Sequence, residues 1–547
     1  MKKTILSAGL TAAAAALAMA LVLPSSRLSP IPALLADSTS CNLSQYKAAQ
    51  GLTAAMEQNL LVVSWSGQNG ADLRAQYGVD NGQPILRELA IKKAGGAWTT
   101  LGRNLTPEYH VVSGVRRMAL DQANPLRAAG IELTEEVINK NRWYAFWDAP
   151  LVMPGSQELQ DEAAWQRSRQ GGGNGAGRGG GRGQDPQAVL QPNRTVGAQR
   201  TPSEIRRADS SFHTTSCSVK TDGASLIVTF PGLSMGIFSG DLQFTVYKGT
   251  NLLRMDAAAK TSEQWVAYKY DAGLKGFSTD LTARVTWRDT GGHPQAHQFG
   301  GVVNQTLSRV KAQNRLIVAE SSGGALAAFP PPHTFFFTRE KDTNLGYVWY
   351  RKDAEGRFAI GVGMPEREED PQYVQNFALY NAPPGTVQKM GVYFYVAPEG
   401  SESARQAVLA FTHGDTFNPV AGYKTFVNHF HLDFTGRQRA SGSLDTPFQD
   451  LIAMKSLGLN VIGLSDFHFE LHANDAGALR LADQKDYFEA SRRASDKDFL
   501  VVPWEEPSAF FGGHYNIIWR PTLLPSLHTT STKFSGNVQS TSATIVR

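Results

Sequence analysis

The sequence predicts a multidomain protein in which a β-sandwich-rich N-terminal region is followed by a partial α/β domain. The chain has 547 residues, 41% of them hydrophobic and 19% charged, which is ordinary for folded domains and long enough for about two to four of them. Residues 211–400 contain repeated runs in which apolar and polar residues alternate. Residues 426–502 instead alternate short apolar runs with helical segments, which is typical of an α/β arrangement.

The N-terminus has the pattern of a secretory signal peptide. Two lysines precede an apolar stretch over residues 10–23, and small residues continue to Ala36. We therefore expect residues 1–36 to be a signal peptide, the mature protein to be secreted or periplasmic, and no stable membrane span to remain after cleavage. Cys41 and Cys217 are the two cysteines of the chain, and they form either one long-range disulfide in an oxidising compartment or two free thiols.

A segment rich in glycine and arginine interrupts the N-terminal region. Residues 155–210 are expected to be a disordered insert, because they contain too few apolar residues to offset the entropy of ordering. Much of the net charge of +4 comes from this segment. Its positive charges are not interleaved with aromatic residues, so no nucleic-acid partner is predicted.

The regions on either side of the insert are predicted to form one sandwich, with residues 37–154 as its first part and residues 211–420 as its main part. Apolar residues alternate with polar ones over 242–246 and again over 392–396, which predicts half-buried antiparallel strands. A turn at residues 355–356 between two such runs predicts a hairpin. Residues 232–236 match the G-x-S-x-G motif of serine hydrolases, but a strand pattern rather than a helix follows, so that activity is rejected.

The pattern changes after residue 420 to alternating strands and helices over residues 421–525. Strands are expected over 426–432, 461–464 and 499–502. Helices are expected over 446–457, with Thr446 as N-cap and Gly458 as the terminating glycine, and over 484–494. This order predicts a parallel sheet, and a tail rich in serine and threonine follows over 526–547.

Histidines and carboxylates gather at the predicted strand ends of this domain. Two imidazoles at i, i+2 lie on one face of the first strand, and two pairs of residues follow the second and third strands. The seven predicted metal ligands are His429, His431, Asp466, His468, Glu505, Glu506 and His514. Such ligands suit one to three divalent ions, Zn²⁺ or Mn²⁺ first and Fe next, and predict hydrolysis by a metal-activated water.

Four short motifs resemble those of the PHP superfamily of metal-dependent hydrolases. They are HFH at 429–431, SDFH at 465–468, PWEE at 503–506 and GHYN at 513–516, within about residues 425–520. The export signal and the β-rich region ahead of them are similar to the branch that contains carbaryl-hydrolase-type enzymes. The resemblance implies a distorted β/α barrel with up to three metal ions held by the residues named above. Roughly half of the residues of such a barrel follow Thr425, so the resemblance implies a truncated member whose activity is in doubt.

Two functions from different classes follow. The first is an exported metal-dependent hydrolase of the PHP type that cleaves a small-molecule phosphate, carboxylate or carbamate ester. The alternative is a periplasmic or surface protein whose β-sandwich binds carbohydrate, with a non-catalytic PHP remnant. Tyr347, Trp349 and Tyr350 are candidate sugar-binding aromatics, although aromatic residues in strands more often belong to the core.

Overall fold

The computed structural model describes residues 39–115, 205–263, 266–299, 306–332, 347–353, 356–364, 380–417, 419–430, 432–465 and 477–505, with short strands and single residues outside these ranges. The predicted signal peptide, residues 155–204 of the predicted insert and the tail over 526–547 lie outside the described residues. Among the described residues, no helix combines the length and the apolar character that crossing a membrane requires.

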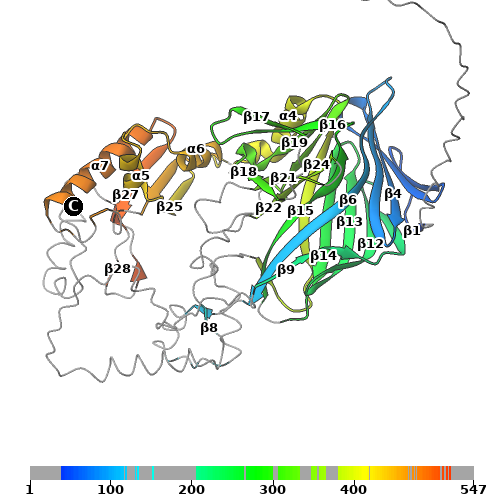
Figure 1. Ribbon diagram of the computed structural model, residues 1–547, viewed down its shortest axis with the longest axis horizontal. Helices are drawn as coiled ribbons and strands as arrows, with labels where there is room; N and C mark the ends of the chain where they lie inside the picture. Colours follow the sequence, from blue (N-terminus) through cyan, green and yellow to red (C-terminus); the bar gives the residue numbers. More distant parts are fainter. Residues whose placement is uncertain are drawn as a thin grey trace, which may run out of the picture. The chain divides into compact units, whose positions relative to one another are not determined.

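Two large, mainly antiparallel sheets form most of the described structure (Figure 1). Neighbouring strands of the first sheet are, in order, β1 (Ser40–Gln45), β11 (Ser216–Thr221), β12 (Ser225–Met235), β13 (Phe238–Tyr247), β14 (Leu252–Lys260), β24 (Gln388–Ala397), β20 (Gly324–Phe329), β19 (Ile317–Ser321), β16 (Thr282–Arg288) and β17 (Pro294–Gln298), and β10 (Ser211–Phe212) pairs with β12. The predicted alternation over 242–246 is confirmed, because Leu242, Phe244 and Val246 of β13 are buried in the core.

The second sheet also joins strands from both sides of the predicted insert. Its order is β18 (Ser308–Val310), β21 (Val348–Lys352), β22 (Arg357–Gly363), β15 (Val266–Ser278), β6 (Trp98–Val115), β5 (Gln83–Lys92), β4 (Asp72–Asp80), β3 (Leu60–Ser66) and β2 (Leu52–Glu57), with β23 (Tyr380–Ala382) beside β15 and β9 (Ile205–Asp209) beside β6. The predicted hairpin over 347–362 is confirmed by the antiparallel pairing of β21 with β22. Residues 205–209, which lie within the predicted insert, form β9 and pair with β6.

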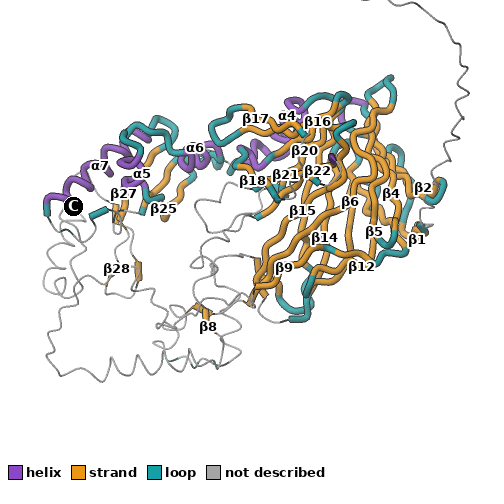
Figure 2. The backbone as a smooth tube through the Cα atoms, in the orientation of Figure 1, coloured by secondary structure: helices purple, strands orange, loops and turns teal. Residues whose placement is uncertain are grey.

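The two sheets pack face to face around one hydrophobic core, as predicted for a sandwich. Tyr77 of the second sheet packs against Phe244 of the first, with ring centroids 4.9 Å apart. The hydroxyl of Tyr270 on β15 donates to the Gly391 carbonyl of β24 at 3.0 Å, and so joins the sheets across the core. Figure 2 shows how strongly strands outnumber helices among the described residues.

A disulfide and one helix complete the described sandwich. Cys41 on β1 is bonded to Cys217, its direct neighbour in the parallel pairing with β11, so the disulfide is the alternative that the structure supports. Helix α4 (Ser401–Thr412) packs on the outer face of the first sheet. Residues 392–396 are therefore buried on both faces rather than half-buried as predicted, since Tyr393 and Tyr395 lie under this helix.

The C-terminal part contains a smaller sheet with the predicted parallel order. β25 (Phe426–Phe430), β26 (Val461–Leu464) and β27 (Leu500–Glu505) are parallel, and β30 (Ile517–Ile518) is antiparallel to β27. Helices α5 (Phe434–Ala440), α6 (Gln449–Ser456) and α7 (Ala478–Ala494) belong to the same part. The described residues form a four-stranded sheet and show no PHP-like barrel, so that part of the predicted fold is not supported.

The predicted helix boundaries in this part are wrong at their N-terminal ends. α6 begins at Gln449, because Thr446 does not cap it and instead contacts the Ser441 hydroxyl at 2.7 Å. α7 begins at Ala478, six residues before the expected start, where the Asp475 carboxylate accepts hydrogen bonds from the first turn. Gly458 does follow the end of α6 with φ of +86°, as predicted.

Candidate functional site

The structure tests little of the predicted metal site. The parallel register places the C-terminal ends of β25, β26 and β27 at one edge of the sheet, as the prediction requires. Six of the seven ligands, His429, His431, Asp466, His468, Glu506 and His514, have side chains outside the described part of the chain. The described side chains include no group of three histidine, cysteine or acidic residues that could hold a metal ion. Metal ligation at this edge stays a prediction.

Glu505 is the predicted ligand whose side chain is described. It ends β27 fully buried, and neither of its carboxylate oxygens has a hydrogen-bond partner among the described residues. Burial raises the pKa of Glu505 to about 7, and the nearby Arg480 opposes that rise. The hydroxyl of Tyr487 lies 2.6 Å from the Leu464 carbonyl oxygen and 2.9 Å from the Trp504 carbonyl oxygen, so its one proton is shared between them and links the end of β27 to β26.

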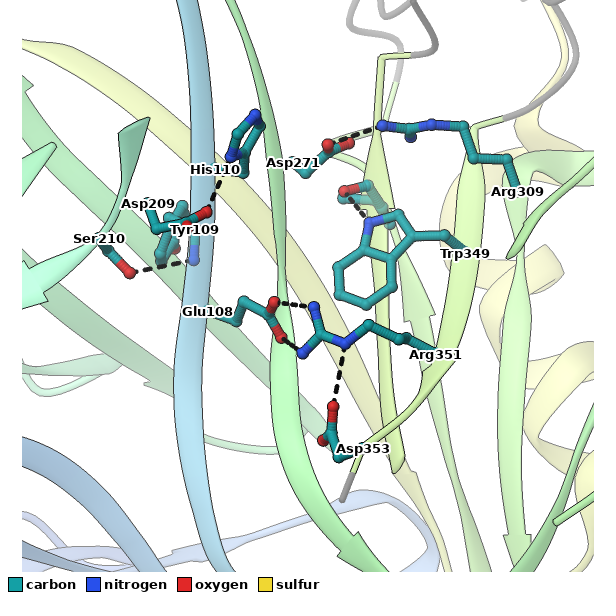
Figure 3. A network of polar contacts seen from close by, with 11 residues as sticks. Glu108, Tyr109, His110, Asp209, Ser210, Asp271, Arg309, Trp349, Arg351 and Asp353 are labelled. Atoms are coloured by element: carbon teal, nitrogen blue, oxygen red, sulfur yellow. Dashed lines mark hydrogen bonds and ion pairs between the residues drawn. The ribbon is translucent and has the colours of Figure 1, made fainter. Parts of the chain in front are cut away.

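Part of the outer face of the second sheet carries a dense polar network (Figure 3). Arg351 of β21 makes a two-pronged ion pair with Glu108 of β6, and its Nε donates to Asp353 at 2.9 Å. The Arg309 guanidinium lies 2.7 Å from the Asp271 carboxylate of β15. These pairs join strands across the sheet, so the network fastens β18, β21, β15 and β6 together.

Trp349 lies at the centre of this network and is closed to solvent. Its indole crosses Gly361 and Gly273, where a Cβ atom would lie 2.4 Å and 2.9 Å from ring atoms. The indole nitrogen donates to the Val362 carbonyl at 2.9 Å, and the residue is 1% exposed. Because a sugar ring needs an open aromatic face, Trp349 is a packing residue, as is usual for aromatic residues in strands.

Tyr347 and Tyr350 are also packing residues. Both lie partly buried against the main core. The Tyr350 ring stacks on His297 with centroids 4.7 Å apart. His297 belongs to β17.

Another part of the same outer face carries a partly exposed tryptophan. Trp98, at the start of β6, is 37% exposed, whereas Trp65, Trp349 and Trp504 are each at most 4% exposed. Trp98 lies opposite Lys92 of β5, which in turn lies opposite Asp72 of β4. These three residues occupy the face that points away from the core.

Polar side chains surround Trp98 and hold one another in place. The Arg74 guanidinium lies 4.5 Å from the Trp98 ring centroid, and the Lys92 ammonium lies 5.3 Å from it. Glu88 accepts hydrogen bonds from Arg74 at 2.6 Å and from the Thr100 hydroxyl at 2.9 Å. Lys92 also pairs with Asp72 at 2.9 Å. We call Asp72, Arg74, Glu88, Lys92, Trp98 and Thr100 the Trp98 face.

The Trp98 face offers an apolar ring beside fixed hydrogen-bond donors and acceptors. Arg74, Glu88 and Lys92 are each partly exposed, so their outer polar atoms are accessible to a ligand. Their ion pairs already restrict their rotamers, which lowers the entropy lost when they bind a ligand. Such a surface suits a neutral molecule with an apolar face and many hydroxyl groups.

Sequence reasoning missed this face, although one signal was present. In β6, Trp98 falls in the same alternation phase as Thr100, whereas Leu101 belongs to the core. A large aromatic residue in the polar phase of a strand indicates an exposed ring. The partners of Trp98 could not be read in this way, because they come from β4 and β5 through the strand register.

Comparison with known proteins gives matches among solved structures. No family model and no curated protein matches the chain. The GH36 α-galactosidase AgaA A355E D548N from Geobacillus stearothermophilus, solved in complex with raffinose, is 12% identical over 53% of this chain and 40% of its own, with a TM-score of 0.26. An α-mannosidase from Enterococcus faecalis V583 is 8% identical over 64% and 30%, with a TM-score of 0.27. The α-galactosidase from Lactobacillus brevis is 10% identical over 81% and 54%, with a TM-score of 0.30.

These matches correct the family predicted from the sequence. They are glycoside hydrolases rather than members of the PHP superfamily, so the predicted membership of that superfamily is wrong. The predicted PHP-type metal-dependent ester hydrolase is wrong with it, whereas metal ligation at the sheet edge stays a prediction. Each motif is only four residues long or shorter, and a few histidines and acids at strand ends also arise in unrelated α/β folds. The chain spans less than two thirds of the length of each of these three structures.

Proposed function

We propose that this chain is an exported carbohydrate-binding protein and that the Trp98 face is its binding surface. The observation that carries the proposal is the 37% exposed indole of Trp98 among polar side chains of neighbouring strands. A sugar ring has an apolar face of C–H groups and a rim of hydroxyls, so it pairs with an aromatic ring flanked by polar groups. The Arg74 and Lys92 cations lie over the Trp98 ring and Glu88 holds Arg74, so a sugar that packs against the indole would meet these polar groups with its hydroxyls.

The sandwich gives this face the rigidity that binding requires. The strands that carry it bury their opposite side in the main core, for example through Leu73, Leu89 and Leu101. The outward positions of Trp98, Lys92 and their neighbours therefore follow from the strand register rather than from loop conformation. Little ordering entropy is lost on binding, which favours affinity.

The proposed location outside the cytoplasm has support from the disulfide. Cys41 and Cys217 are bonded to each other, and such bonds persist in oxidising compartments. The pattern over residues 10–36 is the second support, since it has the form of a secretory signal. A secreted or periplasmic protein would meet extracellular or cell-wall glycans.

Binding of soluble oligosaccharides to the full chain tests the proposal. A glycan panel identifies the ligand, and calorimetry then gives its Kd for the parent and for Trp98→Ala. We expect Trp98→Ala to weaken binding at least about 10-fold, which corresponds to about 1.4 kcal/mol. Tyr423→Ala is the matched control, because Tyr423 is 77% exposed and lies outside the sandwich strands.

Two results would count against the proposal. Failure of the folded chain to bind any glycan of a broad panel would remove carbohydrate binding altogether. Equal affinity of Trp98→Ala and the parent, with Arg74→Ala also unchanged, would place binding elsewhere on the protein. Circular dichroism of each variant establishes that the sandwich is intact.

A further inference from the structure

A hollow of about 350 Å³ lies between the outer face of the first sheet and the start of α4. Its walls come from β16, β17, β19, the turn at η4 (Gln313–Arg315) and the first residues of α4. The volume is at the lower end of the range for small-molecule sites and equals about a dozen water volumes. Apolar lining residues are Pro294, Ala296, Leu316 and Val318.

Three arginines line this hollow. Arg284 and Arg288 alternate with Thr286 along β16, whereas Val285 between them is buried in the core, so the polar residues point away from the core. Arg405 comes from the second turn of α4. The strand alternation and the helix thus direct three guanidinium groups to one place.

Two carboxylates neutralise two of these cations. Arg284 lies 2.5 Å from Glu320, and Glu320 also accepts from the backbone N–H and the hydroxyl of Ser401, each at 3.0 Å. Arg288 lies 2.9 Å from Glu402. Glu320 therefore already pairs closely with Arg284, and Glu402 with Arg288.

Arg405 is left with incomplete compensation. Its guanidinium lies 3.7 Å from Glu402, which already pairs closely with Arg288, and its other close contact is the neutral Asn314 amide oxygen at 3.2 Å. Its side chain is 18% exposed. Burial lowers the pKa of Arg405, Glu402 opposes this effect, and the neighbouring Arg288 adds to it. Among the described residues at the hollow and next to it, three arginines therefore face two carboxylates.

We propose that this hollow is a second ligand site and that it binds a monoanionic sugar acid such as a hexuronate. The planar guanidinium of Arg405 matches the two oxygens of a carboxylate. Thr286, Gln313 and Ser401 supply hydroxyl and amide groups for the ligand's hydroxyls, and the apolar lining suits its C–H groups. A phosphate group carries between one and two negative charges at pH 7, which exceeds the single uncompensated charge.

This inference rests on the hollow alone and is independent of the Trp98 face. Calorimetry of the full chain with sodium D-glucuronate, D-glucose and inorganic phosphate tests it. Saturable binding of one glucuronate per chain is expected, with no measurable binding of glucose. Arg405→Gln is expected to weaken glucuronate binding at least about 10-fold, while Arg357→Gln, an exposed arginine on β22 outside the hollow, leaves it unchanged.

A second variant fills the hollow without removing a charge. Ala296 on β17 pairs with Thr286 and lines the hollow, so Ala296→Phe is expected to block glucuronate while every arginine stays in place. Retention of glucuronate binding in Trp98→Ala would further support a separate site. The proposal is overturned if glucuronate does not saturate the folded parent chain, if phosphate binds as tightly, or if Arg405→Gln and Ala296→Phe both bind like the parent.

Discussion

The Cys41–Cys217 disulfide should stabilise the sandwich substantially, because it closes a very long loop. The bonded residues are 176 apart in sequence. In the chain-entropy treatment the unfolded state loses about 2.1 + 1.5R ln n cal/mol/K, which for this loop is about 18 cal/mol/K, or about 5 kcal/mol at 25 °C. Measured values usually fall below this treatment, so we expect a loss of about 2 to 5 kcal/mol when the bond is removed.

The assay is urea unfolding followed by tryptophan fluorescence. Trp65 packs in the sandwich core, so its emission reports on that part of the protein. The double variant Cys41→Ser with Cys217→Ser is compared with the oxidised parent, and the parent with reductant serves as a matched control that changes no residue. The double variant and the reduced parent should both unfold at a lower urea concentration than the oxidised parent, and by the same amount.

Two outcomes would refute this reasoning. A difference below about 1 kcal/mol would mean that the long loop is not restrained in the unfolded state as the calculation assumes. Two titratable thiols in the denatured parent without reductant would mean that the bond is absent. In that case the support for an oxidising compartment would also be lost.

Three further perturbations have defined outcomes. Gly361→Ala on β22 adds a Cβ 2.4 Å from the Trp349 indole and should lower the free energy of thermal unfolding by about 1 to 3 kcal/mol. Gly96→Ala, whose added Cβ has its nearest atom at 3.4 Å, should lower it little, and equal losses would contradict the packing argument. Arg315→Met leaves Asp415, its partner at 2.6 Å with a 5% exposed side chain, as an unpaired buried charge and should cost about 3 to 5 kcal/mol; a stable variant would argue against a buried pair. The pKa of Glu505 rises from 4.5 to about 7 on folding, so its contribution to the free energy of unfolding is complete below pH 4.5 and falls by about 3 kcal/mol in total as pH rises through 7. In the presence of a chelator, Glu505→Gln should therefore become more stable relative to the parent between pH 5 and pH 8. A difference in stability that does not change with pH would refute the raised pKa.

Several elements of the fold were predictable from local pattern. The alternation in β13 and the turn between β21 and β22 both identify strands, because side chains of a strand point to opposite faces with period two. The parallel order of β25, β26 and β27 was likewise predictable from intervening helices. Burial of β24 on both faces was not predictable from the sequence, because it depends on α4 packing over that part of the sheet.

The predicted metal site also combines features that local pattern predicted with features that it did not. The seven candidate ligands were chosen because they lie on predicted strands or shortly after them, and the three parallel strands exist, yet the chemical family inferred from them was wrong. Short motifs of common polar residues carry little information about ancestry. Trp98 and Arg405 gave no such motif, although each lies in a polar arrangement that tertiary structure assembles.

The amino-acid sequence by itself determined several of the strands and the approximate positions of two helices, because those depend on residue periodicity and on turn residues close in the chain. Strand register, sheet order and the packing of α4 were decided only in the tertiary structure; register brings Arg74 and Lys92 to Trp98, and the packing of α4 on the first sheet brings Arg405 to Arg288. A one-residue change in strand register would turn Arg74, Lys92 or Trp98 to the opposite face of the sheet, and the place of Arg405 depends on how α4 packs, which is why no local pattern specifies these meetings.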